Sequence, residues 1–196
     1  MILRNKIKFL IINCLVINSL QGYDILIEAK TAAYLPTNDD FKNIYNNCGG
    51  IYGVELTGRL KEQWYGFVST DFFSKHGHSL GFNTPTKAKI NNIGLGLKYF
   101  MPFQSGDFYL GLGVLPTRLH TIDSSPFVPN IHTKWSCGGI AKAGLILDLS
   151  TIFFLDFFFD YVFAKANFKA VSGLLTQLHS AKLDSYWLGV GIGWRL

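Results

Sequence analysis

The sequence predicts an all-β fold, an eight-stranded antiparallel up-and-down transmembrane β-barrel. Apolar and polar residues alternate with a period of two along much of the chain, as they do in strands whose two faces meet different surroundings. Beyond the N-terminus, no uncharged apolar run reaches the roughly 18 residues that a spanning helix needs. Because hydrocarbon cannot hydrogen-bond an open sheet edge, strands that cross a membrane have to close into a barrel.

The N-terminal segment, residues 1–22, has the composition of a secretory signal peptide. Basic residues come first, a short apolar stretch follows, and Gly22 is small enough for a cleavage position. A first barrel strand or an uncleaved anchor is the alternative. We expect residues 1–22 to be the signal and residues 23–196 to form the barrel.

The segment 151–163 shows the strand pattern most clearly. Its odd positions are nearly all large and apolar, whereas Asp156 and Asp160 share the even face. No segment with helical periodicity is available to cover such apolar walls, so we expect them to face lipid. The eight predicted strands are 24–35, 50–60, 64–74, 87–100, 106–118, 132–147, 151–163 and 181–196.

The connections between these strands alternate in length, which is typical of barrels with tight turns on one side and long loops on the other. Both termini then lie on the side of the short turns. The short connections are 59–63, 101–106 and 148–150, and the long ones are 36–49, 74–86, 119–131 and 164–180.

Each predicted strand has an apolar face and a face with charged or small residues. Glycines at Gly189, Gly191 and Gly193 suit the inner face of a narrow barrel, where they leave room for large neighbours. The residues placed outward, in chain order, are Ile25, Ile27, Val54, Leu56, Val68, Leu95, Leu97, Leu110, Leu112, Ala143, Leu145, Phe153, Phe157 and Phe159. The charged residues placed inside are Glu28, Lys30, Glu55, Asp71, Lys98, Lys142, Asp156, Asp160 and Arg195, with Arg59 at the lower rim.

This assignment gives the lumen five acids and five bases, so we expect a network of ion pairs in an interior filled by side chains. A soluble sandwich or a lipocalin-type barrel is the alternative, but it needs an apolar interior and a polar exterior, the reverse of this pattern. Aromatic residues near the strand ends predict girdles at the two membrane interfaces. They are Tyr34, Trp135, Tyr161 and Tyr186 near the loops, with Tyr99 and Trp194 near the turns.

Strands with alternating glycines, such as 93–99 and 109–114, resemble those of the OmpA/OmpX/OmpW-type superfamily of eight-stranded outer-membrane barrels, which includes opacity-type proteins. The C-terminal strand is also similar, although it ends in Leu196 with Trp194 two residues earlier rather than in an aromatic residue. The resemblance implies a location in the cell outer membrane, contact with its lipid, and insertion by the barrel-assembly machinery. These motifs describe a fold and do not specify an activity.

Catalytic constellations are scarce in the sequence, and no cofactor motif is visible. A lipid A-modifying enzyme, in which His76 could pair with Asp71 or Asp123, is a further alternative. In lipid A deacylases of the outer membrane a His and a Ser share an outward face, whereas His78 and Ser79 are adjacent and point oppositely. The histidines match no known metal-site spacing, and Cys48 and Cys137 are expected to be free thiols.

The net charge of +5 includes three basic residues of the signal, so it does not indicate nucleic-acid binding. Basic residues near the long loops could instead meet the acidic groups of lipopolysaccharide, and the loops could bind a surface ligand. The predicted function is a structural or surface-interaction role of the adhesion type. The alternative is an OmpW-like narrow channel for small or hydrophobic solutes, for which Phe154 and Phe158 inside the barrel could form the path.

Overall fold

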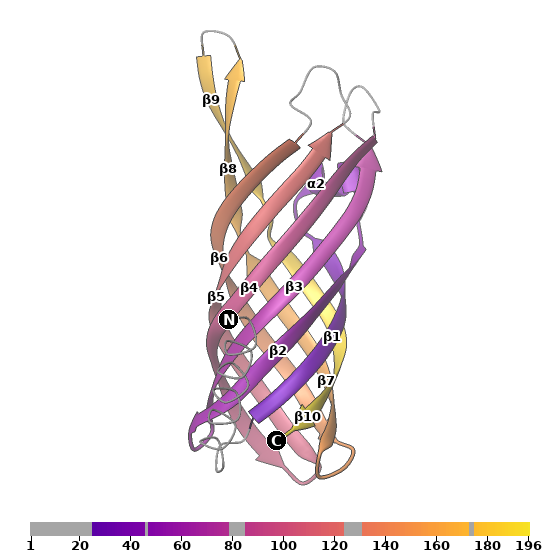
Figure 1. Ribbon diagram of the computed structural model, residues 1–196, viewed down its shortest axis with the longest axis vertical. Coiled ribbons are helices and arrows are strands. Elements are labelled where there is room, and N and C mark those ends of the chain that lie inside the picture. The colour runs from indigo at the N-terminus through magenta and orange to yellow at the C-terminus, as the bar shows by residue number, and fades with distance from the viewer. Residues whose placement is uncertain (1–24, 46, 79–84, 124–130, 173–174) are drawn as a thin grey trace, which may run out of the picture.

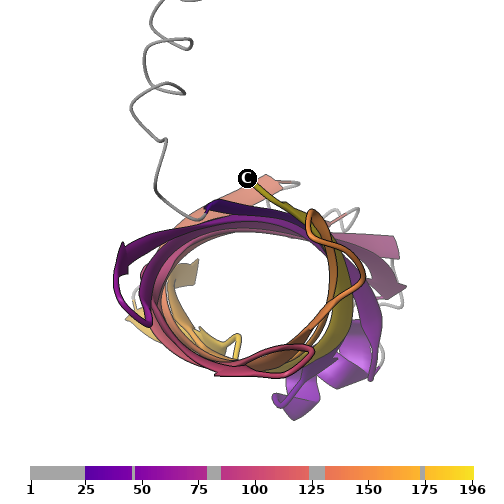
Figure 2. The same cartoon turned by 90° about the horizontal axis from the view of Figure 1, so that it is seen from below.

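The computed structural model describes residues 25–45, 47–78, 85–123, 131–172 and 175–196. Eight strands close into one antiparallel barrel in which each strand pairs with its neighbours, and the first strand pairs with the last (Figure 1). Viewed along its axis, the barrel is a complete ring (Figure 2). The predicted fold class and the eight strands are confirmed. The barrel strands are β1 (Ile25–Pro36), β2 (Gly49–Lys61), β3 (Trp64–His78), β4 (Pro85–Phe103), β5 (Gly106–Asp123), β6 (Ile131–Asp148), β7 (Phe153–Phe163) and β10 (Ser185–Arg195).

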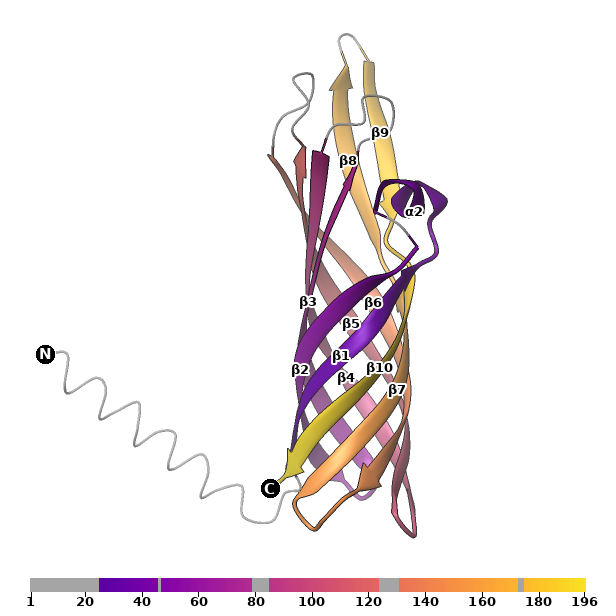
Figure 3. The same ribbon diagram turned by 90° about the vertical axis from the view of Figure 1, so that its right-hand side faces the viewer.

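Strands β3 to β6 are longer than predicted and rise well above the rest of the barrel (Figure 3). Residues 75–78 and 119–123, expected in loops, continue the hydrogen-bonded ladder. The sequence pattern missed them because the alternation of apolar and polar residues stops where the apolar band ends, whereas strand pairing does not need that alternation.

Two elements of the loop side were not predicted at all. The short helix α2 (Asp39–Tyr45) follows β1, and a separate hairpin, β8 (Lys165–Ser172) with β9 (Leu175–Lys182), projects between β7 and β10. The last barrel strand therefore begins at Ser185 rather than at residue 181. No helix among the described residues is long and apolar enough to cross a membrane.

The two faces of the barrel wall differ as the alternation predicts. On β7, Phe157 is 46% exposed and points outward, whereas the next residue, Phe158, is 4% exposed and points inward. The outward face of every barrel strand carries exposed large apolar side chains, so the exterior is apolar and the interior holds the charges. The predicted signal, residues 1–22, lies outside the described residues.

Five of the six predicted girdle residues lie on the outer surface. Trp135, Tyr186 and Trp194 are exposed, and Tyr99 and Tyr161 are half-buried among outward neighbours. Tyr161 and Tyr186 are in register, with ring centroids 5.0 Å apart.

The sixth girdle assignment, Tyr34, was wrong. Its side chain is 2% exposed and lies inside, with its ring centroid 4.4 Å from that of Phe73. Tyr34 has the same strand parity as Glu28 and Lys30, so it must share their inward face. Its place near the loop end of β1 was not sufficient evidence for a position in the girdle.

Candidate functional site: the charged lumen and the outer wall

Glu55 is the centre of the ion-pair network in the lumen. Its carboxylate, contributed by β2, accepts hydrogen bonds or ion-pair contacts from lysines of three other strands. Lys30 of β1 lies 2.8 Å from Oε2, Lys142 of β6 lies 3.3 Å from the same oxygen, and Lys98 of β4 contacts Oε1. All four charged side chains are almost fully buried. One carboxylate thus joins four strands across the interior.

A second carboxylate and several rings complete the surroundings of the lysines. Lys142 also donates to Asp160 Oδ2 at 2.6 Å. The Lys98 ammonium lies 4.1 Å from the ring centroid of Tyr109, and the Lys30 ammonium lies 4.9 Å from that of Phe158. Each buried ammonium therefore has both a carboxylate and an aromatic face, which offsets part of the cost of removing it from water.

The remaining buried carboxyl groups have weaker partners. Tyr109 donates its hydroxyl to Asp156 Oδ2 at 2.8 Å, and Ser69 donates to Asp71 Oδ2 at 3.2 Å. Glu28 lies beside Asp156. Among the described residues, one oxygen each of Glu28, Asp156 and Asp160 is buried without a hydrogen-bond partner.

The predicted balance of charges inside the barrel was wrong for Arg195, which was placed inside, whereas Arg59 was already predicted at the lower rim. Arg195 lies at the rim of the short turns, where its guanidinium contacts Asp107 and Asp148 at 3.1 Å each. Arg59 donates to the Tyr65 hydroxyl at 3.0 Å. Among the described residues, the lumen therefore holds an excess of buried acids. The buried acids are Glu28, Glu55, Asp71, Asp156 and Asp160, and the buried bases are Lys30, Lys98 and Lys142.

Inward glycines make this packing possible. A Cβ atom at Gly191 would collide with the Glu28 carboxylate, and a Cβ atom at Gly144 would collide with the Tyr109 ring. The large inward side chains thus use the space that the glycines leave free on neighbouring strands, as the sequence predicted for a narrow barrel.

Aromatic side chains lie above and below the charged layer. Toward the loops, the Tyr34 and Trp187 ring centroids are 6.5 Å apart, and Phe41 of α2 packs against Tyr34 at 6.0 Å. Toward the turns, the Phe100 ring centroid lies 4.3 Å from that of Tyr65. Two small cavities, one beside Lys30 and Asp71 and the other beside Tyr34 and Asn92, have volumes of only about 10 Å³ each, about the space of a single water molecule.

Comparison with known proteins relates the chain to others by fold alone. Neither a family model nor a curated protein matches the sequence. Neisserial surface protein A is similar with a TM-score of 0.56 at 16% identity, over 89% of this chain and 97% of that chain. OprG of Pseudomonas aeruginosa is similar with a TM-score of 0.62 at 15% identity, over 88% and 95%.

A third similar structure is Ail of Yersinia pestis in complex with the heparin analogue sucrose octasulfate. Its TM-score is 0.53 at 13% identity, over 89% of this chain and 97% of that chain. The chain has the fold of the eight-stranded outer-membrane barrels. This is the fold that the glycine-alternating strands predicted.

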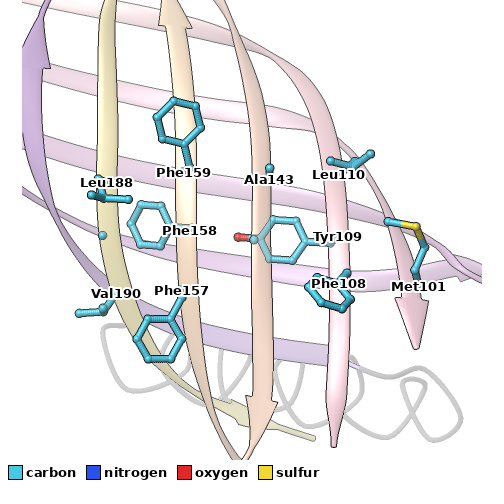
Figure 4. A pocket seen from close by; sticks show the side chains of 12 residues that line it. Met101, Phe108, Tyr109, Leu110, Ala143, Phe157, Phe158, Phe159, Leu188 and Val190 are labelled. Carbon is cyan, nitrogen blue, oxygen red and sulfur yellow. The ribbon is translucent and has the colours of Figure 1, made fainter. Parts of the chain in front are cut away.

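The outer wall of this outer-membrane barrel fold has two apolar grooves over β6. The larger has a volume of about 750 Å³, and Figure 4 shows Ala143 at its floor between Phe157 and Phe159 of β7 and Phe108 and Leu110 of β5. The smaller, of about 610 Å³, adjoins it toward Leu112 and Tyr161. Small outward residues on β6 create both grooves, since the neighbouring strands carry large ones.

The described histidine side chains His76 and His78 do not form a group with a buried carboxylate. His76 and His78 are exposed on the outer face of β3, whereas Asp71, a possible partner of His76, is buried in the lumen. Ser79 lies outside the described residues. Within the part of the chain that the structure describes, no three groups of His, Cys, Asp or Glu are placed to hold a metal. Cys48 and Cys137 are free thiols, as expected.

Proposed function

We propose that the protein is an integral barrel of the outer membrane with a structural or surface-interaction role and a closed lumen. The filled interior is the observation that carries this proposal. The contacts of Glu55 with three lysines cross the barrel, aromatic layers lie on both sides of them, and two cavities among the described interior residues have volumes of about 10 Å³ each. A conducting path would require breaking buried ion pairs, which is costly because each unpaired charge would remain buried.

The loop side supports the surface-interaction part of the proposal. The tall wall formed by β3 to β6, the hairpin β8–β9 and the helix α2 all extend the protein on the side opposite the short turns (Figure 1, Figure 3). Ail, a protein of similar fold, is named for attachment and was solved with a sulfated ligand. We assign no reaction to this chain.

Insertion by the barrel-assembly machinery is part of the same proposal. The outward face of β10 carries Tyr186, Leu188, Val190, Ile192 and Trp194, an apolar face with an aromatic residue near each end. A terminal strand of this kind resembles the strand that the machinery reads in eight-stranded outer-membrane barrels.

Purified wild-type protein in planar bilayers should show no steady ion conductance, because its lumen is filled. A porin inserted in the same bilayers is the control for successful incorporation and detection. Stable single-channel openings of the wild-type protein that persist in several lipids would contradict the closed lumen. They would favour the alternative, a narrow channel for small or hydrophobic solutes.

Surface labelling tests the orientation. In a background with Cys48→Ser and Cys137→Ser, a cysteine introduced at Asp39 of α2 should react with an impermeant maleimide on intact cells. Cysteines introduced at Glu62 and Ser105, both exposed in short turns, should react only after the outer membrane is permeabilised. Reaction of Glu62→Cys on intact cells would show that the orientation is reversed.

A further inference from the structure

The outer face of the tall wall carries a cluster of basic side chains at its loop end. We propose that this cluster, the basic patch formed by Lys87, Lys89 and Arg118 with His76 and His120, binds the phosphate groups of lipopolysaccharide. The inference rests on the proposed location in the outer membrane, and it assigns the lipid contact to a defined place on the wall. It does not depend on whether the lumen is closed.

Strand register places these side chains next to one another. Lys87 is paired with His76 on β3, and Lys89 is paired with His120 on β5. Arg118 is paired with Asn91, so it lies diagonally across from Lys89, at a distance of about 7–8 Å for such neighbours. The three cations therefore lie within the reach of one phosphorylated head group.

Burial shows that the basic patch faces outward. Ala88 is fully buried, and Ile90 and Leu119 are 2% and 4% exposed, so these neighbours point into the barrel. Because side chains alternate along a strand, Lys89 and Arg118 point away from the lumen, and both are exposed. The basic patch consequently faces the membrane surroundings of the wall.

The basic patch lies at the height along the barrel axis where the head groups of the outer leaflet are expected. From Phe108, near the turn end of β5, to Arg118 there are ten residue steps, which span about 24 Å at a tilt of about 45°. This equals the height of the apolar band of an outer-membrane barrel, about 25 Å. Arg118 also lies beside Trp135, with its guanidinium 5.8 Å from the ring centroid.

The charge of the surface points to an anionic lipid. In the described part of β3, β4 and β5, no acidic residue shares the outward face above the apolar band. Directly below the basic patch, Ile93 and Val114 are each 50% exposed and continue the apolar wall. Cationic groups immediately above an apolar wall complement a ligand with phosphates above acyl chains.

The test is a binding titration of purified, folded protein with defined lipopolysaccharide and with the same lipopolysaccharide after enzymatic removal of its lipid A phosphates. We expect the triple variant K87Q/K89Q/R118Q to bind intact lipopolysaccharide roughly tenfold or more weakly than wild type, since each cation near the membrane surface contributes. Removal of the phosphates should weaken wild-type binding similarly and should hardly affect the variant. Circular dichroism verifies that each variant is folded.

The matched control removes the same number of cations from other places on the surface. The triple variant K61Q/K165Q/K182Q should bind as wild type does, because these lysines lie outside the basic patch. An equal loss in both triple variants, or equal binding of phosphorylated and dephosphorylated ligand by wild type, would overturn the proposal. Heparin is titrated in parallel. If the basic-patch variant lost affinity for heparin but kept its affinity for lipopolysaccharide, the proposal would also be overturned. The binding titration is independent of the conductance and cell-labelling measurements. A negative result would therefore overturn the lipopolysaccharide site without contradicting the closed lumen or the orientation of the barrel.

Discussion

Glu55→Gln should destabilise the folded barrel by about 3–5 kcal/mol, the cost typical of leaving buried charges without their partner. The carboxylate of Glu55 is the counter-ion of Lys30, Lys98 and Lys142, all buried with it. A neutral amide would keep the shape of the side chain, but it would remove the charge that the three ammonium groups share. Among the ion pairs of the described lumen, Lys142 would keep its contact with Asp160.

Glu28→Gln is the matched control, and its free energy of unfolding should stay within about 1 kcal/mol of wild type. Glu28 is also buried, but the described lumen holds more acids than bases and one Glu28 oxygen lacks a hydrogen-bond partner. Both variants can be compared by urea unfolding in the same lipid, with the free energy taken from the linear dependence on denaturant. Equal losses for the two variants would show that Glu55 is not the centre of the network.

Phe157→Arg should cost about 2–4 kcal/mol, because it places a charge at the middle of the lipid-facing wall. Phe157 lies midway along β7, between Phe153 and Tyr161. Phe153 is close to Trp194 at the turn end, and Tyr161 is close to Tyr186 at the loop end. It is exposed to the surroundings of the barrel rather than to its lumen. Reversible unfolding in bilayers measures the loss.

Phe163→Arg provides the depth control on the same strand and the same face. Phe163 is the last residue of β7, is 50% exposed and lies two residues before Lys165. Near the interface an arginine costs about 0–1 kcal/mol, so this variant should be tolerated. A similar loss at both positions, or tolerance at both, would contradict a lipid-facing wall centred on Phe157.

Local alternation was sufficient to predict the strands and the two faces of the wall. It separates Phe157 from Phe158 and puts Glu55 and Lys142 on the inner side, because the parity of a strand position is a local property. The same rule places Tyr34 inside, because its parity matches that of Glu28 and Lys30, whereas a position near a strand end is compatible with either face.

Contacts across the barrel could not be predicted in this way. Lys142 meets Glu55 only because the barrel closes with a particular register, which the sequence of neither strand contains. The excess of buried acids has the same origin, since Arg195 lies at the rim, where Asp107 and Asp148 lie within its reach. The hairpin β8–β9 and the upper ends of β3 and β5 were missed because the apolar band, which creates the alternation, does not extend to them.

The contacts of Glu55 have a consequence for how the chain assembles. They join β1, β2, β4 and β6, so the first strands of the barrel depend on a strand that lies about ninety residues further along the chain. A partly inserted sheet that lacked β6 would expose several of these charges to hydrocarbon without their full set of partners. Stepwise insertion of single hairpins is therefore unfavourable. The sheet has to curl and close as one cooperative unit, with its charged side chains kept on the concave side until the last strand pairs with the first.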